Sequence, residues 1–122
     1  MRKPAESAPA GLGVEAVALW SSVVDVFDLE EHERTLLLQA VRTVDLLAKL
    51  EAELQRDGVM VESPQGMKAH PAATEARQQR ITLARLLAAL RLPSGEEGDH
   101  QASARPQRRS GARGTYGIRG AV

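Results

Sequence analysis

Two of the three histidines have neighbours that could support metal or acid–base chemistry. His32 lies in the run Glu30-Glu31-His32-Glu33, whose carboxylates and imidazole are all possible metal ligands. No second histidine accompanies them, and acidic residues complement the dipole in the first turn of a helix, so a solvated first turn is favoured over a metal site. His70 precedes Pro71, which biases His70 toward extended geometry and favours Pro71 at the first helical position. A turn residue capping the following helix is favoured over a catalytic base.

No set of nucleophile, base and orienting residue can be assembled from this sequence. Cysteine is absent, and neither a Gly-x-Ser-x-Gly elbow nor a phosphate-cradling Gly-x-x-x-x-Gly-Lys loop occurs. The glycines of residues 111–120 lie in a polar segment with no predicted strand before them. We therefore expect no catalytic site, no metal and no cofactor.

The distribution of charge is more informative. The chain has 16 Lys and Arg against 16 Asp and Glu, but residues 15–62 hold 11 acids and four bases, a net −7. Residues 67–92 carry a net +4, and residues 100–122 hold five Arg and no acid. This segregation indicates contact between part of the molecule and a polyanion, or acid-to-base packing between subunits.

Flexible arginine side chains suit nucleic-acid phosphates, because they displace counterions without needing fixed geometry. A solvated helix face and a solubilising linker remain open as alternatives for these residues. No aromatic residues are interleaved with them, so any DNA contact should be to the backbone, with sequence preference arising from DNA shape. The candidate DNA-binding residues are Lys68, Arg77, Arg80, Arg105, Arg108, Arg109 and Arg113.

Hydrophobic periodicity predicts three helices, and these would position the candidate DNA-binding residues. The first covers residues 14–27, with Val17, Trp20, Val24 and Phe27 on one face. Asp28 is the expected N-cap of the second, with Glu31 completing a capping box. The second helix runs to Arg56 or Asp57, because no Pro or Gly interrupts it.

Two apolar stripes follow this second helix. One is Leu36, Ala40, Thr43, Leu47, Leu50 and Leu54, and the other is Leu37, Val41, Val44 and Ala48. Two stripes require two packing partners. A helix of the same chain can cover the first stripe, and a neighbouring subunit is the economical candidate for the second. The expected oligomer-interface residues are Leu36, Leu37, Val41, Val44, Leu47, Leu50 and Leu54.

After Gly58, which is typical of a helix end, residues 59–69 read as a β-hairpin with a Ser-Pro-Gln-Gly turn. A third helix over residues 71–91 should pack antiparallel to the second. The predicted fold is mainly α: a short helix, then a helical hairpin with a small β-hairpin at its turn. The expected organisation is a disordered arm (1–12), a helical domain (13–92) and a flexible Arg-rich tail (93–122).

Other features of composition support this picture. Only three aromatic residues occur, so the core must be thin, and self-association is a natural way to complete it. No apolar run is long enough to span a bilayer, and the start lacks the apolar stretch of a signal peptide. A cytosolic protein with no membrane contact is expected.

Four segments carry a resemblance to a known family. They are Leu19-Trp20 in the first helix, Val59-Met60-Val61-Glu62-Ser63-Pro64-Gln65-Gly66, His70-Pro71-Ala72, and Ala89-Leu90-Arg91-Leu92-Pro93. Over residues 19–93 the chain resembles the small subunit of tailed-phage terminases, in the family with a Gly/Ser-Gln-Gly hairpin before a His-Pro or Asn-Pro helix start. Its motif falls here on Gly58, Gly66, His70 and Pro71. The family's usual Leu-x-Pro and nearby Arg are altered, because Ser94-Gly95-Glu96-Glu97 and a long Arg-rich tail follow Leu92-Pro93.

The resemblance implies a non-enzymatic role in packaging phage or prophage DNA in the cytoplasm of a bacterial host. Small terminase subunits form homo-oligomeric rings, recognise the start site on double-stranded viral DNA, and regulate the ATPase and nuclease of the large subunit. The alternative is a helical adaptor that uses the Leu36–Leu54 seam and binds no DNA. A transcriptional regulator ranks last, because no short turn leads into a polar recognition helix.

Overall fold

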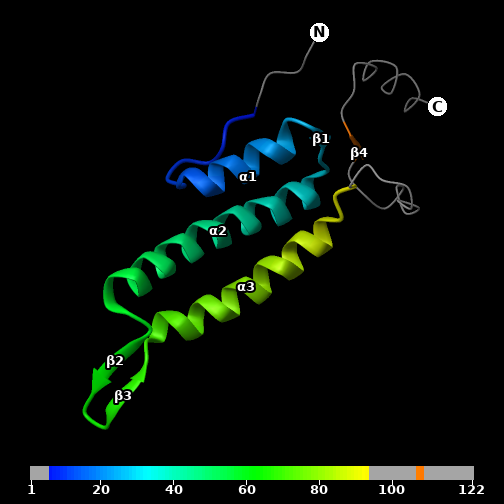
Figure 1. Cartoon of the computed structure of the whole chain (residues 1–122). Helices are drawn as coiled ribbons and strands as arrows, with labels where there is room; N and C mark the ends of the chain where they lie inside the picture. Colours follow the sequence, from blue (N-terminus) through cyan, green and yellow to red (C-terminus); the bar gives the residue numbers. More distant parts are fainter. Residues whose placement is uncertain (1–5, 94–106, 109–122) are drawn as a thin grey trace, which may run out of the picture.

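The computed structural model describes residues 6–93 and 107–108. Three helices, α1 (Val14–Val24), α2 (Glu31–Asp57) and α3 (Pro71–Leu90), form one layer with α2 in the middle (Figure 1). A hairpin of β2 (Met60–Ser63) and β3 (Gly66–Ala69) projects from the turn between α2 and α3. The mainly α fold with a small β-hairpin between the second and third helices is confirmed.

Helix α1 ends at Val24, one turn before the predicted end at Phe27. Phe27 instead lies in a two-residue strand, β1 (Phe27–Asp28), opposite Arg108 of β4 (Gln107–Arg108). Its side chain still enters the core, at 8% exposure. One residue of the predicted face was wrong, because Val17 is 37% exposed, whereas Trp20 and Val24 are buried as predicted.

The start of α2 was predicted two residues too early. The N-cap is Glu30, and Glu33 completes the capping box by accepting from the Glu30 backbone N–H at 2.7 Å. Asp28 cannot begin the helix because it lies in β1, opposite Gln107. At the other end, α2 runs to Asp57 as predicted, and Gly58 follows with φ 83°, a conformation that favours glycine.

The hairpin has the predicted position. Met60 lies opposite Ala69, and Ser63 opposite Gly66, in an antiparallel register. The His70 N–H donates to the Val59 carbonyl at 2.8 Å, which closes the base of the hairpin against α3. Helix α3 then runs antiparallel to α2, with Ala76 and Leu90 buried.

The core is concentrated where α1 crosses α2. Leu37 and Val41 are fully buried there, in a cluster with Trp20 and Val24 of α1 and Leu90 of α3. The first half of the stripe expected to meet a neighbouring subunit is therefore covered within the chain, by α1. The sequence pattern identified a second apolar stripe correctly but assigned its first half to the wrong partner.

Part of the segment expected to be a disordered arm makes defined contacts. The Trp20 indole N–H donates to the Glu6 carbonyl at 3.2 Å, and the Glu6 carboxylate pairs with Arg34. Ala8 and Leu12 pack against the core cluster. Residues 6–12 thus lie on the α1–α2 pair.

Candidate functional site

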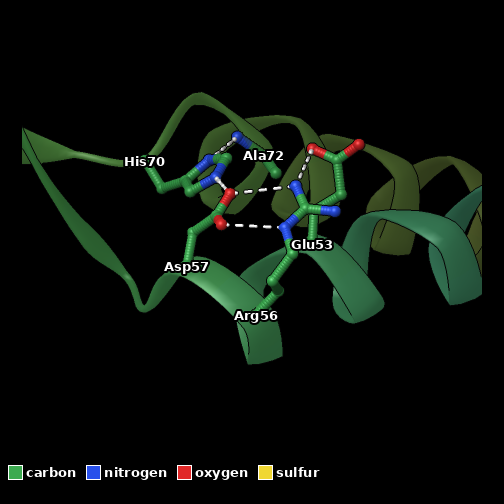
Figure 2. A network of polar contacts seen from close by, with 5 residues as sticks. All are labelled: Glu53, Arg56, Asp57, His70 and Ala72. Carbon is green, nitrogen blue, oxygen red and sulfur yellow. Dashed lines mark hydrogen bonds and ion pairs between the residues drawn. The ribbon is translucent and has the colours of Figure 1, made fainter.

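The most connected polar cluster lies at the joint between α2, the hairpin and α3 (Figure 2). Asp57, the last residue of α2, accepts from Nε and Nη2 of Arg56 at 2.9 and 3.1 Å. Its Oδ2 lies 3.0 Å from Nε2 of His70, and Nδ1 of His70 accepts from the Ala72 N–H at 2.9 Å. His70 is the N-cap of α3.

These contacts determine which ring nitrogen of His70 carries the proton. Because Nδ1 accepts a hydrogen bond from Ala72, the neutral ring holds its proton on Nε2 and donates it to Asp57. The imidazole is 8% exposed and both nitrogens are engaged. His70 therefore caps the helix, as the sequence interpretation favoured over a catalytic base.

The Asp57 carboxylate is held in its ionised form. The hydrogen bond from Arg56, followed by that from His70, lowers the pKa of Asp57 to about 2. At neutral pH the joint therefore contains a carboxylate between a guanidinium and an imidazole N–H.

Glu53, Asp57 and His70 bring three possible metal-ligating atoms within 4.8 Å of one another. Two features oppose a cation there. A metal on Nε2 would require the proton on Nδ1, which would remove the acceptor for the Ala72 N–H. The Arg56 guanidinium also contacts both carboxylates, at 2.9 Å to Asp57 and 4.0 Å to Glu53. The hydrogen bonds and ion pairs of this cluster therefore stabilise the junction between α2, the hairpin and α3.

Four exposed cations lie on the hairpin and α3. Lys68 lies on β3, and Arg77, Arg80 and Arg85 lie on α3. Arg80 bonds to Glu51 of α2 at 3.1 Å. Lys68, Arg77 and Arg85 form no ion pair among the described residues. Of the predicted tail residues, Arg108 contributes its backbone to β4, whereas Arg105, Arg109 and Arg113 lie outside the described residues.

The residues proposed for an oligomer interface separate into two groups. Leu37, Val41 and Leu47 are buried within the chain, so they have little surface to offer a second copy. The other four are half-buried: Leu36, Val44, Leu50 and Leu54. Any interface on α2 must use this second group.

A cavity of about 200 Å³ opens between the three helices. It is lined by Val44, Leu47 and Ala48 of α2, Leu83 of α3, and the acidic residues Glu15 and Glu51. Val44 and Ala48, the last two residues of the second apolar stripe, therefore line this cavity. The meeting of Glu15 with Leu83 could not be predicted from the sequence, because it depends on how three helices pack.

Among the described residues, no helix is both long enough and apolar enough to cross a membrane. No curated protein and no solved structure matches the chain. A family model described as phage terminase, small subunit, matches residues 16–101, a segment that covers most of α1 and all of α2, the hairpin and α3. Since this is well over half of the sequence, the chain belongs to the phage terminase small subunit family.

Proposed function

We propose that this protein is the DNA-recognition and regulatory component of a phage or prophage packaging motor, acting with a terminase large subunit in the bacterial host cytoplasm. Membership of the family supports the terminase role, and the family is generally that of the non-catalytic subunit. The polar joint at His70 supports a non-enzymatic role, because its groups are engaged in capping and ion pairing.

The observation that carries the DNA-binding proposal is the set of exposed cations without intramolecular partners. Lys68 and Arg77 are free to meet phosphates, since neither forms an ion pair among the described residues. Arg80 can exchange its exposed partner Glu51 for a phosphate, because surface ion pairs contribute only about 0–1 kcal/mol. Arg105, Arg108, Arg109 and Arg113 would extend this contact.

The proposed contact is to the DNA backbone. Trp20 and Phe27 are 4% and 8% exposed, so no aromatic ring in residues 6–93 is available for stacking on bases. Sequence preference would then depend on DNA shape.

We further propose that the protein acts as a homo-oligomeric ring. The core is small and lies mainly at one end of the helical layer, and Leu36, Val44, Leu50 and Leu54 keep exposed apolar area on α2. Assembly would bury that area.

The alternative is an adaptor without DNA binding. It is favoured by the exposed apolar side chains of the hairpin region, Val59, Met60 and Met67, at 61%, 48% and 60% exposure. DNA retardation at low and moderate salt separates the two functions, because an adaptor would retard no DNA.

The decisive experiment replaces Arg105, Arg108, Arg109 and Arg113 together by Ser and measures DNA affinity against salt concentration. Each lost phosphate contact should reduce the salt slope by about one, so the full variant should lose up to about four. Replacing Arg42 and Lys49 on α2 by Ser is the control for general loss of charge. An unchanged slope in the tail variant would remove the tail from the proposed site.

A further inference from the structure

We propose that a second copy of this chain docks Ile81 of α3 into the cavity between the helices, with Arg77 and Arg85 pairing with Glu15 and Glu51. The inference rests on the proposed homo-oligomer and names the surfaces that would form its contact. In that assembly Arg77 pairs across the contact, so Lys68, Arg80 and the tail arginines would carry the proposed phosphate contacts. It keeps Val44, Leu47 and Ala48 of α2 in the contact and adds α3 of the neighbouring copy as the other surface.

The cavity has the size and chemistry to accept one aliphatic side chain. Its floor is apolar, formed by Val44, Leu47, Ala48 and Leu83, and its volume is about 200 Å³. For comparison, an apolar protein cavity of about 150 Å³ can hold benzene. Helix α1 lies along only the N-terminal half of α2 (Figure 1), and Val44 and Ala48 are only half-buried where they line the cavity.

The rim of the cavity is acidic. Glu15, in the first turn of α1, is exposed and forms no ion pair among the described residues. Glu51 is exposed and bonds only to Arg80 of its own chain, at 3.1 Å. An apolar floor between two exposed carboxylates suits an aliphatic group flanked by cations.

Helix α3 presents that arrangement on its outer face. Residues four apart on a helix are neighbours on one side, so Arg77, Ile81 and Arg85 form a continuous ridge. Ile81 is 43% exposed, and neither arginine forms an ion pair among the described residues. The ridge matches the cavity in both its apolar centre and its charged flanks.

A competing ridge on α2 is less suitable. Leu46 is 39% exposed and has Arg42 and Lys49 nearby on the helix, but Lys49 is already paired with Asp45 at 3.1 Å. This ridge therefore provides a matched control.

The ridge and the cavity are different surfaces of the same chain, so each copy can offer its ridge to one neighbour and its cavity to another. This head-to-tail contact builds a closed ring if the rotation closes. A two-fold dimer in which each copy's ridge meets the other's cavity would also satisfy both surfaces, so a wild-type mass of two chains would overturn the ring and a larger mass supports it.

Two double variants test the contact. Arg77→Glu with Arg85→Glu gives an acidic ridge facing an acidic rim, and Glu15→Lys with Glu51→Lys gives a basic ridge facing a basic rim.

Measured by light scattering behind a sizing column, the wild type should be a large assembly, and each variant alone should fall to monomer mass. An equimolar mixture should regain the large mass, because each altered surface then meets its complement. Circular dichroism should show that both variants keep the wild-type helix content, since all four residues are exposed.

The control, Arg42→Glu with Lys49→Glu, should keep the wild-type mass. The proposal is overturned if the wild type is monomeric, if the ridge and rim variants keep full mass, if the mixture stays small, or if the control alone dissociates. The tail variant distinguishes this proposal from the proposed function, because it should lose DNA affinity at full mass. A monomeric wild type that still retards DNA would remove this contact and the proposed ring but leave the DNA-binding function. An assembly that retards no DNA would remove only the DNA-binding function.

Discussion

His70 connects three elements through one residue. Its ring accepts from Ala72 at the start of α3 and contacts Asp57 at the end of α2, and its backbone N–H donates to Val59 before the hairpin. A side-chain substitution here therefore removes the cap of α3 and the contact with Asp57, whereas the backbone hydrogen bond at the base of the hairpin remains.

We expect His70→Ala to lower the free energy of unfolding by about 0.5–2 kcal/mol, the usual range for loss of an N-cap. His70→Asn, which can still accept from the Ala72 N–H, should recover part of the loss. Urea denaturation of both variants measures the difference. His32→Ala, at an exposed position, should change stability by less than about 0.5 kcal/mol, and an equal loss there would contradict the capping role.

The lowered pKa of Asp57 predicts a pH dependence of stability. The Asp57 carboxyl group has a pKa of about 2 in the folded chain, below the ordinary aspartate pKa of 3.8, so it binds protons more readily in the unfolded chain. Its stabilising contribution is therefore present above about pH 4 and is lost as the pH falls toward 2. Denaturation of Asp57→Asn should show a deficit relative to wild type that shrinks over this range. Asp25→Asn, at the C-cap of α1, is the control, and a deficit for Asp57→Asn that is constant with pH would refute the prediction.

At the scale of elements, local signals placed most of the fold. Gly58 and Pro71 marked the end of α2 and the start of α3, because each carries a backbone preference that acts locally. The junction of α1 and α2 was misplaced because Phe27–Asp28 pairs with Gln107–Arg108, a long-range contact with no local pattern. Periodicity likewise identified both stripes of α2 but could not say which would be covered by α1.

The two stripes should differ in their effect on stability. Leu37 is fully buried, so Leu37→Ala should cost about 2–5 kcal/mol, as cavity-forming substitutions do. Leu54→Ala should cost less, because Leu54 is only half-buried. Thermal and urea unfolding at low protein concentration, where assembly is minimal, compare the two directly. A larger loss at Leu54 would contradict the placement of the core.

At the scale of the whole molecule, three helices in a single layer cannot cover all of one another's apolar surface. The layer is closed at the end where α1, α2 and Leu90 of α3 meet, and it is open where Val44 and Ala48 line the cavity. The sequence indicated surplus apolar surface and segregated charge. The place where the surplus apolar surface meets the acidic charge could not be predicted, because the cavity combines residues from all three helices, including Glu15 and Leu83.

The position of Trp20 has an optical consequence. It is the only tryptophan, it is 4% exposed, and its indole N–H bonds to Glu6 of the arm. Tryptophan fluorescence therefore reports on one place in the molecule, the surface of α1 and α2 on which residues 6–12 lie. Deleting residues 1–12 should hydrate the ring and shift its emission to longer wavelength, whereas deleting residues 94–122 should not. Following this emission during a titration with DNA would show, without an added dye, whether residues 6–12 leave the α1–α2 pair.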